Sequence, residues 1–199
     1  AYNIPEVMGT KEYAQALIDY KGVDQSALQP YLSGQNPGID WMDELLRTGV
    51  TQNYKVAISK GSEDTQYYVS GGYLSHKGVV TDTKFERYSV KANVRSKLFK
   101  WLEMTADINM SQSNGSGAGF NQNQSNPLWV GLNYSPTMEM MNSQGQYNQD
   151  PYNNIQKNPY GILHGNENDR KRSVVSGHID LKFNIIKGLT FTTTNGVDY

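Results

Sequence analysis

The feature that most constrains the fold is a run of alternating apolar and polar residues between Thr51 and Ser111. Four segments in this run alternate with period two and are separated by turn residues, which is the pattern of β-hairpins. In Trp101–Ser111, for example, every even-numbered residue from Leu102 to Met110 is apolar and every odd-numbered residue from Glu103 to Ser111 is polar. We therefore expect strands with one apolar and one polar face.

Alternation of apolar and polar residues along the whole chain predicts six strands, at 53–60, 66–74, 85–95, 101–111, 174–185 and 189–199. The links 61–64, 96–100 and 186–188 are short, and the links 75–84 and 112–170 are longer. Short turns therefore gather at one end of the strands and long loops at the other, as in outer-membrane barrels. The segment 112–170 is rich in Asn, Gln, Gly and Ser and contains four Xaa-Pro breaks, so we expect most of it to be irregular.

The first 50 residues are the least strand-like part of the chain. Thr10 is a candidate cap for a helix that ends near Gly22, and Asp40 is a candidate cap for a short helix over Trp41–Arg47. We expect both helices to lie on the surface rather than to form a domain.

Composition narrows the class of protein. Hydrophobic residues make up only 37% of the chain, yet Tyr (14) far outnumbers Phe (5), which favours strands that expose one face to water. The net charge of −1 gives no electrostatic reason to expect nucleic acid as a partner. The chain has no cysteine and therefore no disulfide or thiolate metal site, a composition that fits a bacterial cell envelope at least as well as a cytosol.

Catalysis is not indicated. The three histidines are scattered, and Glu103 and Asp107 lie roughly 13 Å apart along one strand, outside the usual carboxylate spacing of glycosidases. We expect no enzyme activity, no cofactor and no metal site. A pair of His178 and Asp180 on one strand face is read as a solvated pair rather than as a catalytic dyad.

The segment 112–170 contains aromatic side chains that could stack on sugar rings or could only pack the loop. The candidates are Trp129, Tyr134, Tyr147, Tyr152 and Tyr160.

Alternation alone does not decide between a membrane barrel and a soluble β-sandwich, because strands of both have one polar face. A series of motifs does, in the order Asp40-Trp41-Met42-Asp43-Glu44, Arg47 to Tyr54, Ser59 to Thr65, Tyr67 to Ser70, Gly72-Tyr73-Leu74, Gly78-Val79-Val80, Phe85 to Val90 with Asn93, Lys100-Trp101-Leu102, Ile185 to Phe191 and Gly196 to Tyr199. This series resembles the SusC/RagA family of TonB-dependent outer-membrane transporters of Bacteroidetes.

The resemblance implies an all-β fold of antiparallel strands and hairpins that form part of an outer-membrane barrel of about 22 strands, with short helices near the N-terminus. Residues 1–50 would belong to an extracellular loop region, 51–199 to a partial barrel, and 112–170 to a long extracellular loop. The sequence shows no signal peptide, TonB box or plug and holds strands for about a quarter of such a barrel, so we expect a partial chain.

The function implied is import of oligosaccharides or peptides across the cell outer membrane. The expected partners are a SusD-like surface lipoprotein, TonB through an N-terminal part that this sequence lacks, outer-membrane lipid, and the glycan or peptide cargo. Polar strand residues would face the lumen, namely Arg87, Lys91, Asn93, Arg95, Glu103, Asp107 and Asn109. The alternative is a soluble β-sandwich adhesin or carbohydrate-binding module whose binding surface is the long loop.

Overall fold

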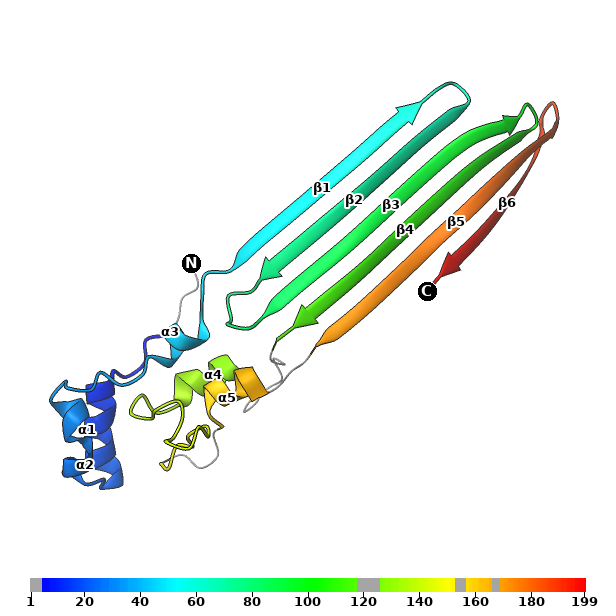
Figure 1. Ribbon diagram of the computed structural model, residues 1–199. Coiled ribbons are helices and arrows are strands. Elements are labelled where there is room, and N and C mark those ends of the chain that lie inside the picture. The colour runs from blue at the N-terminus through cyan, green and yellow to red at the C-terminus, as the bar shows by residue number, and fades with distance from the viewer. Residues whose placement is uncertain (1–4, 118–125, 153–156, 166–168) are drawn as a thin grey trace. The chain divides into compact units, whose positions relative to one another are not determined.

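The computed structural model describes residues 5–117, 126–152, 157–165 and 169–199 (Figure 1). The chain divides into two compact units. Unit 1 comprises Ala1–Thr48, Gly78–Thr83 and Gly117–Asn168, and unit 2 comprises Gly49–Lys77, Lys84–Ser116 and Asp169–Tyr199. Unit 1 holds the helices and unit 2 holds the strands. Among the residues that the structure describes, no helix has the length and apolar character needed to cross a membrane.

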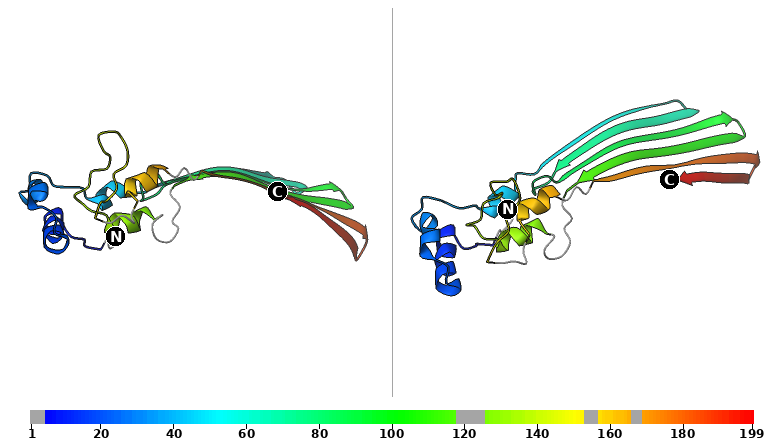
Figure 2. Two further views of the ribbon diagram at one scale, coloured as in Figure 1. Left: turned by 90° about the horizontal axis from the view of Figure 1, so that it is seen from below. Right: turned by 60° about the horizontal axis from the view of Figure 1, so that its bottom comes forward.

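Unit 2 is a single sheet of six antiparallel strands paired in chain order, which confirms the predicted all-β architecture. The strands are β1 (Val50–Gly61), β2 (Thr65–Lys77), β3 (Lys84–Phe99), β4 (Leu102–Ser116), β5 (Arg170–Ile186) and β6 (Leu189–Asp198). Figure 2 shows them as one curved layer.

The strands are longer than the alternation predicts, mainly where β2 is linked to β3 and β4 to β5. At that end Lys84 pairs with Ser116, and Gly115 pairs with Arg170. These residues are polar or small, so no apolar period marks them, but backbone pairing with a neighbouring strand does not require one. We call this end of the sheet the loop end, and the end with the three short links 62–64, 100–101 and 187–188 the turn end.

Cross-strand register assigns each side chain to a face. Ile58, Val69, Ala92 and Ile108 are paired in one row across β1 to β4, and all lie on the apolar face. Their sequence neighbours Ser59, Tyr68, Asn93 and Asp107 form the adjacent row on the polar face. The predicted two-sided character of the strands is therefore carried across the whole sheet.

Unit 1 is built from α1 (Thr10–Lys21), α2 (Gln25–Leu32), α3 (Trp41–Leu45), α4 (Pro127–Asn133) and α5 (Pro159–Gly165). Its larger core joins three segments that are far apart in the sequence, and its members are Trp41, Met42, Leu45, Val80, Val130, Tyr134, Ile162 and Leu163. A smaller core lies between α1 and α2 around Ala14, Leu17 and Leu28. The expectation that both N-terminal helices lie on the surface is therefore wrong for α3, because helices from the long loop cover it.

The link between β2 and β3 is held to α3 by backbone and side-chain contacts. Leu46 forms a β-bridge with Val80, and this pairing ends α3 before the predicted Arg47. The Arg47 guanidinium then donates to the carbonyls of Gly78 at 3.1 Å and Thr83 at 2.9 Å. Arg47 thus fixes both ends of this link.

Helix starts follow the predicted signals in part. Asp40 caps α3 as expected, since its carboxylate accepts from the backbone N–H groups of Met42 and Asp43. Gly9 rather than Thr10 is the N-cap of α1, because the Thr10 hydroxyl instead donates to the Pro37 carbonyl at 2.6 Å. Gly22 ends α1 in the left-handed conformation, with φ of 66°, as predicted.

Two helices begin at Asn-Pro pairs for which the sequence predicts only a break. Asn126 accepts from the backbone N–H of Leu128 at 3.0 Å, and Asn158 accepts from that of Tyr160 at 3.0 Å. The asparagine supplies the cap, and the proline that follows has the φ of a first helical residue and no N–H to satisfy. These pairs are helix starts as well as breaks.

Candidate functional site

The apolar face of unit 2 carries an aromatic belt near each end of the sheet. At the loop end Tyr54, Tyr73 and Tyr88 are paired across three strands, and the rings of Tyr73 and Tyr88 are 4.9 Å apart. At the turn end a chain of ring contacts joins Phe99, Trp101, Phe183 and Phe191, with centroid distances of 5.3, 6.1 and 6.0 Å. Apolar rows containing Val90, Ala92 and Val94 lie between the belts.

A β-bulge completes the belt at the turn end. Along β3 the apolar face holds even-numbered residues, but the register shifts between Lys97 and Phe99. Phe99 is consequently paired with Leu102, which lies on the apolar face. The bulge thus turns an odd-numbered aromatic side chain to the apolar side.

The spacing of the belts matches a bilayer. Tyr88 and Phe99 are eleven residues apart on one strand, which is about 36 Å at 3.3 Å per residue and roughly 26–30 Å along the normal at a tilt of 35–45°. Outer-membrane barrels have an apolar band of about 25 Å flanked by aromatic girdles.

Most of the apolar face is uncovered. Val56 is 70% exposed, Ile108 43% and Val197 61%. The described part of unit 2 holds no helix and no second sheet that could pack on this face. A contiguous apolar surface of this extent indicates contact with lipid or with another protein surface.

The polar face carries a network across four strands. The Asn93 side-chain amide donates to Asp107 at 2.7 Å, and His178 Nε2 lies 3.3 Å from the other Asp107 oxygen. His178 also lies 3.8 Å from Asp180, which accepts from the Thr194 hydroxyl. The predicted pairing of His178 with Asp180 is therefore present, but Asp107 from the next strand is the closer carboxylate.

A second group of ion pairs lies at the turn end of the same face. The Glu103 carboxylate lies 3.6 Å from the Arg95 guanidinium and 3.9 Å from the Lys182 ammonium. Arg87, Lys91 and Asn109 lie nearer the loop end, beside a hollow of about 370 Å³. All seven residues predicted to face the lumen thus share one face, and whether that face borders a lumen stays a prediction.

The five predicted ligand-contact aromatics are not equivalent. Tyr134 is only 4% exposed, its ring packs edge-on against Trp41, and its hydroxyl donates to the Asn148 carbonyl at 2.7 Å. This burial leaves almost none of the ring free to stack on a ligand, so Tyr134 is a core residue. Burial, with Asp150 nearby, raises the pKa of Tyr134 to about 12.

The other four aromatics differ in exposure. Tyr152 packs on the small core between α1 and α2, and Tyr160 packs on the larger core. The Tyr160 ring also lies 4.0 Å from the ring of His164, which is paired with Asp82 at 2.8 Å. Trp129 and Tyr147 are 43% and 38% exposed, so these two keep the most surface for a ligand.

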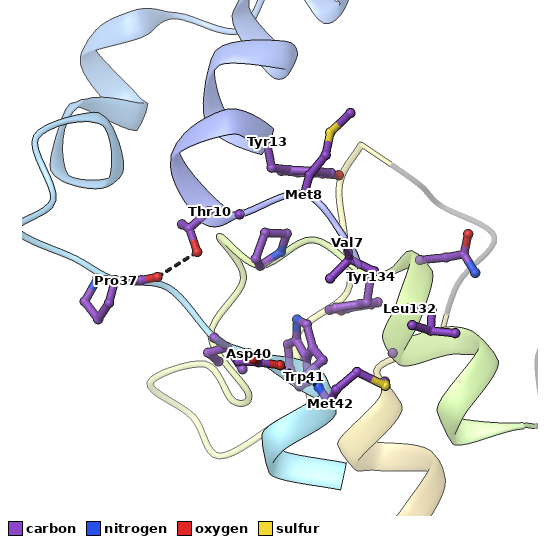
Figure 3. Close-up of a pocket in the computed structure, with 15 residues that line it drawn as sticks. Val7, Met8, Thr10, Tyr13, Pro37, Asp40, Trp41, Met42, Leu132 and Tyr134 are labelled. Carbon is purple, nitrogen blue, oxygen red and sulfur yellow. Dashed lines mark hydrogen bonds between the residues drawn. The ribbon is translucent and has the colours of Figure 1, made fainter. Parts of the chain in front are cut away.

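Unit 1 also contains a pocket of about 460 Å³, drawn in Figure 3. Its walls come from the segment before α1, from the start of α3 and from α4 with the residues that follow. The rings of Trp41 and Tyr134 line it, together with the side chains of Val7 and Met8, which are exposed (Figure 3). No local sequence pattern predicts this pocket, because its walls come from segments that are far apart in the chain.

The chain matches named proteins over most of its length. It is 25% identical to TonB-dependent receptor P3 of Formosa agariphila, over 98% of this chain and 20% of that protein. It is 24% identical to TonB-dependent receptor SusC of Bacteroides thetaiotaomicron, over 80% of this chain and 18% of that protein. The chain thus spans about a fifth of the length of these relatives. No protein-family model matches it.

Solved structures give the same fold. The RagAB peptide importer in its closed-closed state aligns with a TM-score of 0.71 and 20% identity, over 96% of this chain and 25% of that one. A second structure, of the RagAB peptide transporter, aligns with a TM-score of 0.72 and 19% identity. The resemblance to SusC/RagA-like TonB-dependent transporters is confirmed, and the six-stranded sheet fits part of such a barrel.

Proposed function

We propose that the chain forms part of the wall and surface loops of a TonB-dependent outer-membrane importer. The apolar face of unit 2 lies against lipid, and the polar face borders the aqueous interior. The observation that carries this proposal is the uncovered apolar band between two aromatic belts, because a soluble sheet buries its apolar face against a second layer.

The open edges of the sheet agree with a larger barrel. Within the described residues β1 and β6 each pair with one neighbour only, so each leaves one row of backbone N–H and C=O groups without a strand partner. Such edges are unfavourable in a bilayer, where barrels close completely. Further strands of the same transporter would complete the pairing.

Unit 1 would lie on the cell surface and take part in cargo capture. Its three segments are joined to the sheet at the loop end, where β1 begins and where β2–β3 and β4–β5 are linked. Long loops of outer-membrane barrels are extracellular. Trp129 and Tyr147 and the pocket over Trp41 would contact a glycan or peptide, together with a SusD-like lipoprotein, and TonB would act through a part of the transporter outside this sequence.

The sheet does not support the alternative of a soluble β-sandwich. A β-sandwich requires a second sheet about 10 Å from the first, and the described strands all belong to one sheet. An adhesin or carbohydrate-binding module of the sandwich type would need that layer to cover Val56, Val90 and Ile108.

Single-cysteine labelling of the complete transporter tests the proposal. This chain has no cysteine, so only cysteines elsewhere in the protein would have to be replaced first. Cysteines at Val90 and Ile108 should be reached by lipid-soluble quenchers, and cysteines at the adjacent Lys91 and Asn109 only by water-soluble reagents. Each pair differs by one position on one strand and is its own control. Equal access at both members of a pair would contradict a lipid-facing sheet.

A further inference from the structure

We propose that the loop-end half of the polar face is a binding site for an oxyanion, such as a carboxylate or a sulfate, held by Lys55, Arg87 and Lys91. A role of this site in cargo passage rests on the proposed function. The site would make that function more specific, because it names the chemical class of ligand that the polar face would bind.

The three cations surround a hollow that a glycine opens. Gly72 of β2 is paired with Lys55 on one side and with Ser89 on the other, and its lack of a side chain leaves the backbone accessible. Arg87 and Lys91 lie two residues to either side of Ser89, so both project from the same face of β3. Lys55, Gly72, Arg87 and Lys91 all line the hollow of about 370 Å³.

Charge is segregated along the polar face. Its loop-end half holds Lys55, Arg87, Lys91, Arg170 and Arg172, and Asp198 at the edge strand is the one carboxylate among the described strand residues of that half. Its turn-end half holds Glu103, which forms ion pairs with Arg95 and Lys182, and also Asp107 and Asp180, which both lie beside the His178 imidazole.

The loop-end cations have no such compensation. Across the described residues, none of Lys55, Arg87, Lys91 and Arg172 forms an ion pair. Three cations beside one hollow repel one another, and a bound anion would relieve that repulsion.

The donors present suit an oxyanion. The Arg87 guanidinium offers a planar fork that matches a carboxylate or sulfate, and the two lysines add point charges. Hydroxyl groups of Ser89 and Ser111 line the same hollow and could donate further hydrogen bonds. Among the described residues that line the hollow, none carries a carboxylate.

Two sources could supply the anion. It could belong to an acidic cargo, or to an acidic side chain of another part of the transporter that lies in the interior. Both use the same chemistry, and one pair of variants distinguishes them.

The test compares two triple variants of the purified complete transporter. The loop-end variant is K55Q/R87Q/K91Q, and the control R95Q/K97Q/K182Q removes the same number of cations from the turn end of the same face. The probes are trigalacturonate, with a carboxylate on each ring, and neutral maltotriose, measured by calorimetry at low salt. For an acidic cargo, the loop-end variant should bind trigalacturonate at least about 10-fold more weakly, while the control changes its affinity less than about 3-fold. Maltotriose binding should not distinguish the variants.

An internal acidic partner gives a different pattern. Trigalacturonate then binds none of the proteins, and the loop-end variant lowers the melting temperature of the complete transporter more than the control does. Ser89→Asp supplies a second test, because it places a carboxylate in the hollow and should reproduce the loss of probe binding or, with an internal partner, the loss of thermal stability.

Equal effects of the two triple variants, or no effect of either on binding and melting, would overturn the oxyanion site. The assay requires only purified complete protein. The cysteine-labelling experiment can therefore succeed or fail independently, and a failure of one proposal is not read as a failure of the other.

Discussion

Tyr134 is a single residue whose packing in unit 1 also changes the pKa of its side chain. Its ring contacts Trp41, with centroids 5.0 Å apart, and its hydroxyl donates to the Asn148 carbonyl. The same carbonyl also accepts from the Asn158 side chain at 3.0 Å, so it keeps a partner when the tyrosine hydroxyl is removed. The neighbouring Asp150 is buried, and its negative charge together with burial raises the pKa of Tyr134 to about 12.

Replacing Tyr134 with Phe should have opposite consequences at neutral and at high pH. Near pH 7 the variant loses one hydrogen bond, and unit 1 should be destabilised by about 0.5–1 kcal/mol. An unfolded tyrosine ionises near pH 10, so the wild-type fold loses stability as pH rises from about 10 towards 12, by up to roughly 2–3 kcal/mol. The Phe variant has no such loss. The stability difference should shrink and then reverse over this interval.

The measurement is the rate of limited proteolysis within unit 1 of the complete transporter at pH 7 and at about pH 11. Tyr20→Phe is the matched control, because Tyr20 is 87% exposed and should contribute little at either pH. A Tyr134→Phe effect that is the same at both pH values would show that the phenol is not protected from ionisation by the fold.

Strand β4 has one apolar face and one polar face, so its two sides suit different surroundings. Ile108 pairs with Ala92 on the apolar face, and Asn109 pairs with Lys91 on the polar face. The strand has no helix or sheet packed on it within unit 2, so its stability depends on pairing with β3 and β5 and on what covers its apolar side.

Arginine at these two adjacent positions should separate the faces. Ile108→Arg near mid-depth of a bilayer should destabilise the barrel by roughly 2–4 kcal/mol, because the charge loses its hydration. Asn109→Arg should cost much less, since the polar face remains wet. Chemical unfolding of the complete transporter in lipid vesicles measures both. Because the substituent and the strand are the same, the difference reports only the face, and equal costs would argue against a bilayer on one side.

The two units are distinct at the scale of the whole molecule although the chain passes between them repeatedly. The β4–β5 ladder ends at Gly115 and Arg170, and Ser116 still pairs with Lys84 of β3. Of the residues between Gly117 and Asp169 that the structure describes, none pairs with a strand of the sheet. They do contribute α4 and α5, which supply Val130, Ile162 and Leu163 to the core around Trp41.

Replacing Ala118–Asn168 by a short Gly-Ser linker in the complete transporter should therefore affect the units differently. Barrel assembly, read from heat-modifiable electrophoretic mobility, should be retained, while cargo uptake or binding of a surface lipoprotein should fall. Trp129→Ala is the matched smaller change, because it removes one exposed ring and leaves the core intact. Loss of assembly in the linker variant would show instead that the segment is structural for the barrel.

Much of unit 2 could be predicted because its information is local. Side chains alternate along a strand with period two. The face on which each residue of Leu102–Met110 lies can therefore be predicted without knowing which strand is its neighbour. Short links such as 187–188 likewise predict hairpins from the local sequence alone. The caps Asp40 and Gly22 are also local, since each acts on backbone groups within a few residues.

The site features required tertiary structure because they depend on which residues lie opposite one another. Tyr54, Tyr73 and Tyr88 become one belt only through register, and the bulge before Phe99 cannot be read from alternation. Register likewise decides that Lys55, Arg87 and Lys91 meet at Gly72, whereas Asp107 meets His178. In unit 1 the burial of Trp41, Val80 and Tyr134 follows from contacts between segments up to about a hundred residues apart. Side-chain alternation, which is a local property, therefore sets the faces of the strands, whereas the pairing of distant segments sets which side chains lie next to one another.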